Sequence, residues 1–415
     1  MRLRRNRAFA VFWSARTISF AGTGITMVVL PVLVYGMTHS PAWVATVGLM
    51  EFLPYLAFGL LAGAVADRVN RKKIMVGCDV AAALMLVTVP VATALHLLVV
   101  AQLLVVALGI AVAYVWFDAA NFGTLPALVD RAELPVAASL IGSSAQVALL
   151  CAPTAGAALL AVMSPSDALG FDAASYLISA LLLLSVRRPF ARPRPEQDTK
   201  RLRADIAEGL RFLWQQPVIR TMTFSVTCVC LGWGGTFALL VVYASRALHL
   251  NHVDVRLGLL YSAGEAGGLV AAAAVPTLIK RLPIGPMAAA FLAANAAALA
   301  FLAIAPSYGW ALAAFFLDEL TYLMVLTTGI TLRQMLTPDH LQARVNTAGR
   351  MLAGAGLPLG AALGGVLAES LPIRLAFGLL TISVVAGAGL AGWSCLGSGP
   401  LSAVSVAVPV PEPSA

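Results

Sequence analysis

The sequence predicts an all-α polytopic membrane protein with twelve transmembrane helices in two six-helix halves. Of its 415 residues, 60% are hydrophobic and only 11% are charged. The mean hydropathy is +0.89, and a water-soluble protein could not bury so much apolar surface in its core. Apolar runs of about 20 residues recur, the length at which a helix crosses ~30 Å of hydrocarbon. A helix satisfies its own backbone hydrogen bonds in lipid and is therefore the expected spanning form.

The apolar runs form two groups of six, separated by a polar segment. We expect spans at residues 9–35, 43–66, 74–95, 98–122, 136–163 and 168–186, then at 218–244, 257–279, 284–305, 308–332, 346–368 and 373–396. The first run follows an Arg-rich N-terminus but is too long for a signal peptide, so we interpret it as a span. The predicted parts are an N-terminal half (1–186), a cytoplasmic linker (187–217), a C-terminal half (218–396) and a disordered cytoplasmic tail (397–415).

The linker contains a short amphipathic pattern. Residues 205–214 place Ile206, Leu210, Leu213 and Trp214 on one side of a helix. We expect this helix to lie in the membrane interface. A solvated connector is the alternative.

The distribution of Lys and Arg residues predicts which side of the membrane each loop faces. Of the 27 basic residues, 23 fall in loops on one side, three on the other (Arg246, Arg256 and Arg374), and Arg16 lies inside the first span. Basic loops face the cytoplasm. We therefore expect a multi-pass plasma-membrane protein with both termini in the cytoplasm. This also explains the net charge of +8 without a nucleic-acid partner, since no nucleic-acid module surrounds the basic residues.

The sequence shows no pattern typical of an enzyme or a cofactor site. The five cysteines lie in or next to apolar runs and lack metal-ligand spacing. It contains no nucleotide-binding loop, metal cluster or nucleophile–base pair in a suitable context. We expect no catalysis, no cofactor and no metal.

Four carboxylic acids lie inside predicted spans. An ionisable residue in lipid costs several kcal/mol unless it faces a cavity or a partner, so each is a functional candidate. Glu51 and Glu265 each lie eight residues into spans that are equivalent in the two halves. Asp318 and Glu319 are neighbours near the middle of another span, about 100° apart around the helix, so at least one should face a central cavity.

These four acids are candidates for proton coupling or for binding a cationic substrate. The alternative is a structural role, with hydrogen bonds to Arg16, Tyr or Ser side chains. Arg16 lies deep enough in its span to need a partner. Asp79, Asp118 and Asp172 lie close to span ends, where charge costs little, and we expect them to be structural or gating groups.

Aromatic and small residues add two further expectations. Aromatic residues near the cavity are expected to line an apolar pocket or to pack in the bundle: Tyr55, Trp233, Phe237 and Tyr322. Small residues predict close helix contacts at the pair Gly59 and Gly63, and at the repeat Gly356, Gly360 and Gly364. Pro153 and Pro358 lie in the middle of equivalent spans and predict bends.

The loop between the second and third spans resembles the signature loop of the major facilitator superfamily. The residues that match are Gly63, Asp67, Arg68, Arg71, Lys72 and Lys73. Four further segments, 121–129, 170–176, 208–213 and 338–346, are similar to the branch that contains macrolide-efflux proteins and the enterobactin exporter. The resemblance covers nearly all of the chain except its tail.

The resemblance implies proton-driven export of a small drug-like molecule or secondary metabolite by alternating access, with a role in antibiotic resistance. It also implies that Asp67, Arg68, Arg71 and Asp118 form a gate that locks the inward-closed state. The expected partners are the small molecule, protons and the lipid bilayer, and we expect a monomer. A proton-coupled importer and a non-transporting sensor or scaffold on the same fold remain alternatives.

Overall fold

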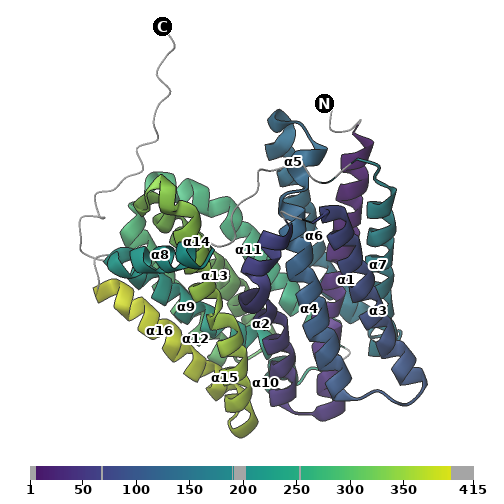
Figure 1. Ribbon diagram of the computed structural model, residues 1–415. Helices are drawn as coiled ribbons and strands as arrows, with labels where there is room; N and C mark the ends of the chain where they lie inside the picture. The colour runs from purple at the N-terminus through teal and green to yellow at the C-terminus, as the bar shows by residue number, and fades with distance from the viewer. Residues whose placement is uncertain (1–5, 67–68, 189, 191–201, 252–253, 394–415) are drawn as a thin grey trace.

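The computed structural model describes residues 6–66, 69–188, 190, 202–251 and 254–393. Figure 1 shows a helical bundle in which the described elements are helices and turns. The helices are α1 (Arg7–Thr38), α2 (Pro41–Ala66), α3 (Arg71–Ala94), α4 (Val100–Phe122), α5 (Leu125–Leu128), α6 (Leu134–Leu159), α7 (Pro165–Ser185), α8 (Leu202–Gln215), α9 (Pro217–Ala238), α10 (Leu240–Leu248), α11 (Val255–Arg281), α12 (Ile284–Ile304), α13 (Tyr308–Leu336), α14 (Gln342–Gly354), α15 (Gly356–Ser370) and α16 (Ile373–Trp393).

Within the described residues, 11 helical segments are long and apolar enough to span a membrane, and a further, bent helix pair raises the count to 12. The predicted all-α fold with twelve spans in two halves is confirmed.

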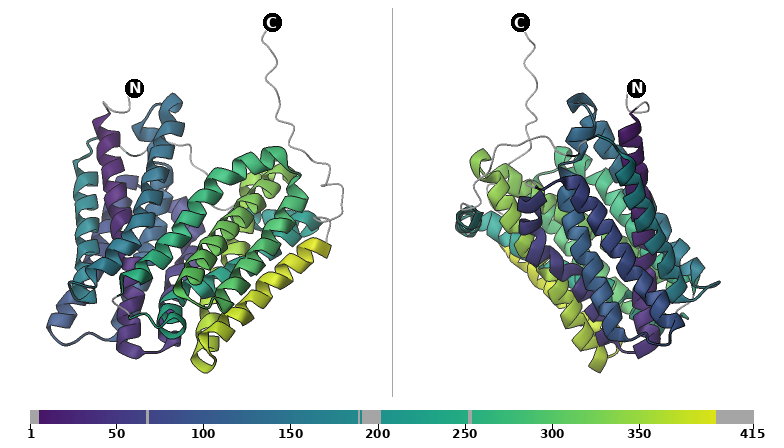
Figure 2. Two further views of the ribbon diagram at one scale, coloured as in Figure 1. Left: turned by 180° about the vertical axis from the view of Figure 1, so that it is seen from behind. Right: turned by 45° about the vertical axis from the view of Figure 1, so that its right-hand side comes forward.

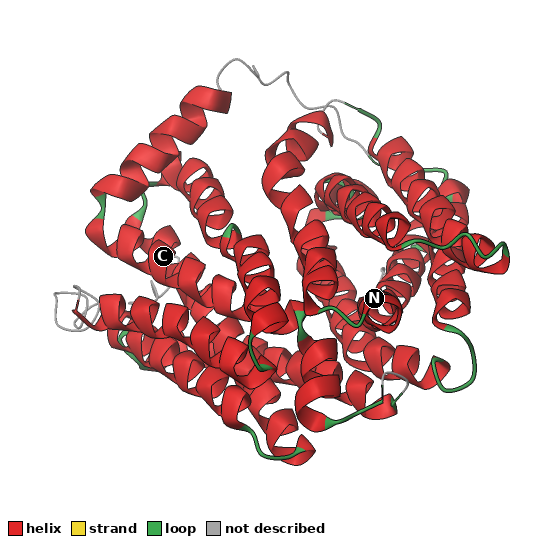
Figure 3. Cartoon of the chain, turned by 90° about the horizontal axis from the view of Figure 1, so that it is seen from below, coloured by secondary structure: helices red, strands yellow, loops and turns green. Residues whose placement is uncertain are grey.

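The two halves pack their helices in the same order. In the N-terminal half, neighbouring helices follow the order α6, α1, α7, α3, α4, α2. In the C-terminal half, the order is α15, α9, α16, α12, α13, α11. The halves meet where the ends of these two series face each other, α2 against α15 and α6 against α11. Each half therefore surrounds one side of a shared centre, as the end-on view shows (Figure 3).

The halves are joined mainly at the end of the bundle away from the chain termini. We call this end the distal side, and the end where α1 begins the terminal side. On the distal side, Glu369 of α15 accepts hydrogen bonds from Ser40 Oγ (2.9 Å) and Ala42 N (3.1 Å). Arg246 of α10 donates to Tyr35 Oη (3.4 Å) and to the carbonyl of His39 (3.3 Å). Figures 1 and 2 show the halves in contact at the distal end and apart toward the termini.

The distal end of α11 is held by a charged corner. The carboxylate of Asp254 accepts hydrogen bonds from the backbone and guanidinium N–H groups of Arg256 (2.6–3.1 Å). These hydrogen bonds lower the pKa of Asp254. The same guanidinium lies 5.7 Å from the ring centroid of Tyr308, which links α11 to the start of α13.

The seventh predicted span, residues 218–244, is bent. It breaks at Leu239 into α9 and α10, which differ in direction by 62°. Neither Pro nor Gly occupies the break. The turn buries Tyr243, whose ring stacks on Phe377 (5.0 Å) and whose hydroxyl donates to the carbonyl of Leu302 (2.9 Å). Tertiary packing of α10 therefore accounts for the bend.

The predicted amphipathic helix is α8, and it packs on protein. α8 contacts α14 and α9. Glu208 forms an ion pair with Arg344 of α14, and Leu213 is buried, whereas Leu210 and Trp214 are exposed. The helix therefore ties the linker to the terminal side of the C-terminal half.

One predicted small-residue contact is present and the other is absent. Gly356, Gly360 and Gly364 of α15 face α9 so closely that a Cβ at Gly360 would meet the carbonyl oxygen of Leu231. By contrast, a Cβ at Gly59 or Gly63 would have no heavy atom of the described residues within 4 Å. The prediction that this pair mediates a close helix contact is wrong, because the face that carries it is open in this conformation.

Candidate functional site

Three of the predicted carboxylic acids lie at one depth in the bundle. Glu51 and Glu265 each follow the first residue of their helices, Pro41 of α2 and Val255 of α11, by ten positions. Glu319 follows Tyr308, the first residue of α13, by eleven. All three helices begin on the distal side, so a rise of 1.5 Å per residue places each glutamate about 15 Å from that side. The three side chains are half-buried.

These glutamates have polar and charged neighbours in the interior. Glu319 Oε2 accepts a hydrogen bond from Trp233 Nε1 at 2.5 Å. Glu265 lies near enough for its charge to act on Glu319, and Glu51 acts in the same way on Tyr261. Glu51 belongs to the N-terminal half and the other two glutamates to the C-terminal half. Glu51 therefore lies near Tyr261 of the C-terminal half, on the helix that also carries Glu265.

Five aromatic rings surround this point, and we call them the aromatic cluster: Phe52, Trp233, Phe237, Tyr261 and Tyr322. Trp233 stacks between Phe237 (4.6 Å between centroids) and Tyr322 (4.8 Å). Phe52 of α2 lies 6.0 Å from Trp233 and 6.3 Å from Phe237. Tyr261 meets Phe237 edge-on at 5.6 Å. The cluster joins α2, α9, α11 and α13 and carries Glu319 on its central ring.

A carboxylate hydrogen-bonded to an indole, among stacked rings, suits an organic cation. Aromatic faces attract cations, and the attraction grows when water is excluded. A carboxylate adds a charge-assisted contact. Tyr55, the fourth predicted aromatic residue, lies elsewhere: its hydroxyl accepts a hydrogen bond from Arg350 of α14.

Asp318 faces away from its neighbour Glu319. Its Oδ1 accepts a hydrogen bond from Asn295 Nδ2 of α12 at 3.1 Å, and the side chain is buried. The structure thus separates the two adjacent acids, with Glu319 in the aromatic cluster and Asp318 between α12 and α13.

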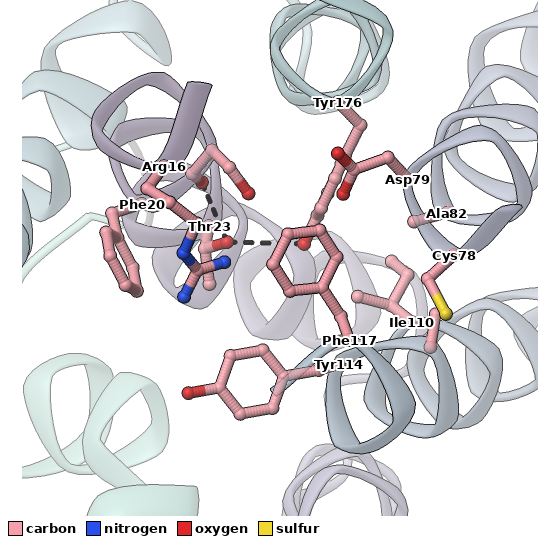
Figure 4. Close-up of a pocket in the computed structure, with 12 residues that line it drawn as sticks. Arg16, Phe20, Thr23, Cys78, Asp79, Ala82, Ile110, Tyr114, Phe117 and Tyr176 are labelled. Carbon is pink, nitrogen blue, oxygen red and sulfur yellow. Dashed lines mark hydrogen bonds between the residues drawn. The ribbon is translucent and has the colours of Figure 1, made fainter. Parts of the chain in front are cut away.

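Arg16 lines a small pocket in the N-terminal half (Figure 4). Its guanidinium carbon lies 4.3 Å from the ring centroid of Phe20 and 4.5 Å from that of Phe117. The pocket also contains Asp79 of α3, and Tyr176 of α7, which shares a 3.2 Å hydrogen bond with Thr23. The pocket has room for about one water molecule.

The expectation that Asp79 and Asp172 lie at span ends where charge costs little is wrong. Both side chains are buried, with exposed fractions of 1% and 0%. α3 begins at Arg71 and α7 at Pro165, three residues before each predicted span, so both acids lie deeper than expected. Asp172 is fully hydrogen-bonded, to Thr26 Oγ1 (2.5 Å) and Ser175 Oγ (2.8 Å).

The predicted gate lies partly outside the described residues, because Asp67 and Arg68 are not among them. Arg71 is buried and donates hydrogen bonds to the carbonyls of Gly123 (2.6 Å) and Ala66 (3.3 Å), which joins the start of α3 to the ends of α2 and α4. Asp118 is half-buried on α4, and its charge acts on Arg16.

The two predicted helix-bending prolines behave differently. α6 continues without interruption through Pro153. The span that contains Pro358 breaks at Ala355 into α14 and α15. Proline cannot donate a hydrogen bond to the carbonyl four residues earlier, which here belongs to Gly354, the last residue of α14.

A sequence model of the family described as the Major Facilitator Superfamily matches residues 12–357, most of the chain. The chain belongs to the major facilitator superfamily. Within the superfamily it is similar to exporters. It is 25% identical over 390 residues to the multidrug efflux pump Tap of Mycolicibacterium fortuitum, covering 92% of this chain and 94% of that protein. It is 27% identical over 401 residues to the enterobactin exporter EntS of Citrobacter koseri, covering 92% of each.

Solved structures share the fold of this superfamily member. The nucleoside transporter NupG aligns with a TM-score of 0.77 at 14% identity, covering 92% of this chain and 98% of that one. A bacterial homologue of the human lysosomal transporter Spinster, in an inward-facing and occupied conformation, aligns with a TM-score of 0.75 at 14% identity, covering 94% and 97%. Together with the family match, the spans make the chain a multi-pass membrane transporter.

Two residues of the aromatic cluster in this transporter were not selected from the sequence. Phe52 follows Glu51 directly, and Tyr261 lies one helical turn before Glu265. Proximity to the predicted acids was the available signal. Asp79 could also have been recognised from the sequence, because this acidic residue lies in the second turn of its predicted span.

Proposed function

We propose that this transporter exports a cationic, aromatic small molecule, a drug or a secondary metabolite, in exchange for protons. The observation that carries the proposal is Glu319, whose carboxylate accepts the indole N–H of Trp233 at the centre of the aromatic cluster. Glu51 and Glu265 add negative charge at the same depth. The similarity to Tap and EntS, both exporters by name, supports the direction.

The site suits alternating access because both halves contribute to it. Phe52 and Glu51 come from α2, and Trp233 and Glu319 come from the C-terminal half. A cation held between them contacts two bodies that move relative to each other. Its binding energy then differs between conformations, which is the condition for a ligand to shift their populations.

The orientation follows from the basic residues. With 23 of 27 Lys and Arg residues expected in loops on the terminal side, that side is assigned to the cytoplasm, in the plasma membrane. The distal closure by Glu369 and Arg246 then makes this an inward-facing conformation. In the opposite state, Asp67, Arg68, Arg71 and Asp118 are assigned to the cytoplasmic gate, and the break at Ala355 gives α14 freedom to move relative to α15.

Removing Arg246 is expected to weaken the distal closure. Its hydrogen bonds to Tyr35 and His39 across the halves contribute about 1 kcal/mol, so Arg246→Ala should raise the outward-open to inward-open ratio about fivefold. Spin labels at Leu95 and Ile304, exposed at the distal ends of α3 and α12, report the change as a longer distance population.

The matched control for this prediction is Arg374→Ala. Arg374 is also on the distal side, but it donates to the carbonyl of Ala247 within its own half. An unchanged distance distribution in Arg246→Ala, or an equal change in Arg374→Ala, would contradict the assignment of this latch.

The proposed function is tested by accumulation of ethidium, an aromatic cation, in whole cells. Expression of the protein should lower cellular ethidium relative to cells with empty vector, and a protonophore should abolish the difference. Higher ethidium in expressing cells would indicate an importer instead. Equal ethidium with and without the protein would favour a sensor or scaffold and would overturn the proposal.

A further inference from the structure

Two buried groups of opposite charge face the pocket in the N-terminal half, and each has one polar atom without a hydrogen-bond partner among the described residues. Arg16 is 4% exposed, and its Nε has no hydrogen-bond partner among the described residues. Asp79 is 1% exposed, and its Oδ2 also has no hydrogen-bond partner among the described residues. Both side chains line the same pocket, from α1 and α3 (Figure 4). Burying charged groups whose polar atoms are not all satisfied is costly, so we expect a function for this arrangement.

The pocket is too small for an organic substrate. It has room for about one water molecule. The aromatic cluster belongs to α2, α9, α11 and α13, whereas this pocket is lined by α1, α3, α4 and α7. What the pocket can accept is water and a proton, so it is distinct from the proposed substrate site.

Every element around Asp79 contributes ionisable groups, but none pairs with it in the described residues. They are Arg16 on α1, Cys78 on α3, Tyr114 and Asp118 on α4, and Asp172 and Tyr176 on α7. Asp172 already accepts hydrogen bonds on both carboxylate oxygens. Tyr176 shares a hydrogen bond with Thr23. Asp79, which has Ser179 of α7 as a neighbouring hydroxyl, is thus the buried acid lining this pocket whose Oδ2 accepts no hydrogen bond from the described residues.

We propose that Asp79 is the residue that carries the coupled proton, with Arg16 as its mobile counter-charge. The assignment rests on the proposed proton-coupled function and deepens it. In the outward-open state, the Asp79 carboxylate takes a proton from water on the distal side. In the inward-open state, it releases that proton to water on the terminal side and becomes an anion again.

Arg16 makes the two protonation states of Asp79 differ in energy. With Asp79 neutral, the guanidinium stays between the rings of Phe20 and Phe117, as it lies here. With Asp79 ionised, the guanidinium is drawn toward the carboxylate across the pocket. Because the two residues belong to α1 and α3, forming and breaking this pair couples proton release to a movement of α1, which contacts α10 and α11 of the C-terminal half.

The test uses purified full-length protein in liposomes, with ethidium as the probe. Two activities are measured: ethidium movement against its gradient, driven by a pH difference, and exchange of ethidium at equal pH. Asp79→Asn should reduce the driven movement at least tenfold and should retain exchange within about twofold. Asp79→Glu, which restores the acid, should recover part of the driven movement.

The matched control is Asp172→Asn, which removes a neighbouring buried acid that is fully hydrogen-bonded. It should lower thermal stability and leave the ratio of driven movement to exchange unchanged. Driven movement in folded Asp79→Asn at the wild-type rate would overturn the assignment, and so would loss of exchange together with driven movement. Absence of driven movement in the wild-type protein would instead overturn the proposed function itself.

Discussion

Glu319→Gln lowers the affinity of the purified transporter for ethidium by about 10- to 100-fold. The substitution keeps the shape of the side chain and its hydrogen bond from Trp233, but it removes the negative charge next to the cation. Interactions with a charged group contribute about 1.5–3 kcal/mol, and each 1.4 kcal/mol is about tenfold in the dissociation constant. Fluorescence titration with ethidium at constant ionic strength measures the change.

The neighbouring acid supplies the control for this prediction. Asp318 faces Asn295 and not the aromatic cluster, so Asp318→Asn should keep the ethidium affinity within about twofold. The opposite pattern, with a large loss in Asp318→Asn and none in Glu319→Gln, would mean that the substrate binds between α12 and α13.

Gly360→Val prevents the C-terminal half from packing. A Cβ at Gly360 would lie against the carbonyl of Leu231 and 3.0 Å from the backbone nitrogen of Gly235. These are backbone atoms of α9, which cannot move aside as a side chain can. We expect a loss of about 3 kcal/mol or more in the free energy of unfolding, seen as a lower melting temperature and a smaller monodisperse fraction in detergent.

Gly59→Val tests whether the effect depends on contact and not on glycine itself. The space around Gly59 is open to 4 Å, so this variant should keep the melting temperature of the wild-type protein within a few degrees. If both variants were equally stable, the close approach of α9 and α15 would not describe the protein in its membrane.

The spans were predictable because their signal is strong and local. Apolar runs of membrane length can be recognised from the sequence alone, and eleven helical segments and one bent pair appear where they were expected. The predicted positions of the helix starts were less accurate, because polar residues occupy the first turn of these helices and do not belong to the apolar runs. Asn70 caps α3 by accepting hydrogen bonds from the backbone N–H groups of Lys72 and Lys73. Ser164, followed by Pro165, caps α7. Reading these caps as helix starts would have placed Asp79 and Asp172 at their true depth.

The candidate site was predictable only in part. Helical geometry indicates that Asp318 and Glu319 point in different directions, but which one faces the centre depends on the position of Trp233, 86 residues earlier. The rings of Phe52 and Trp233 meet across the two halves, and no periodicity in the sequence predicts that contact. The bend at Leu239 was missed for the same reason, because packing of Tyr243 on Phe377 produces it.

A cryo-electron microscopy map of the protein with bound ethidium tests the central claim most directly. We predict density for the planar cation against the ring of Phe52 and the edge of Trp233, with its charge beside the Glu319 carboxylate. The same density should be absent in Glu319→Gln at an equal ethidium concentration. Ethidium bound away from the aromatic cluster, with Trp233 and Glu319 unchanged, would contradict it.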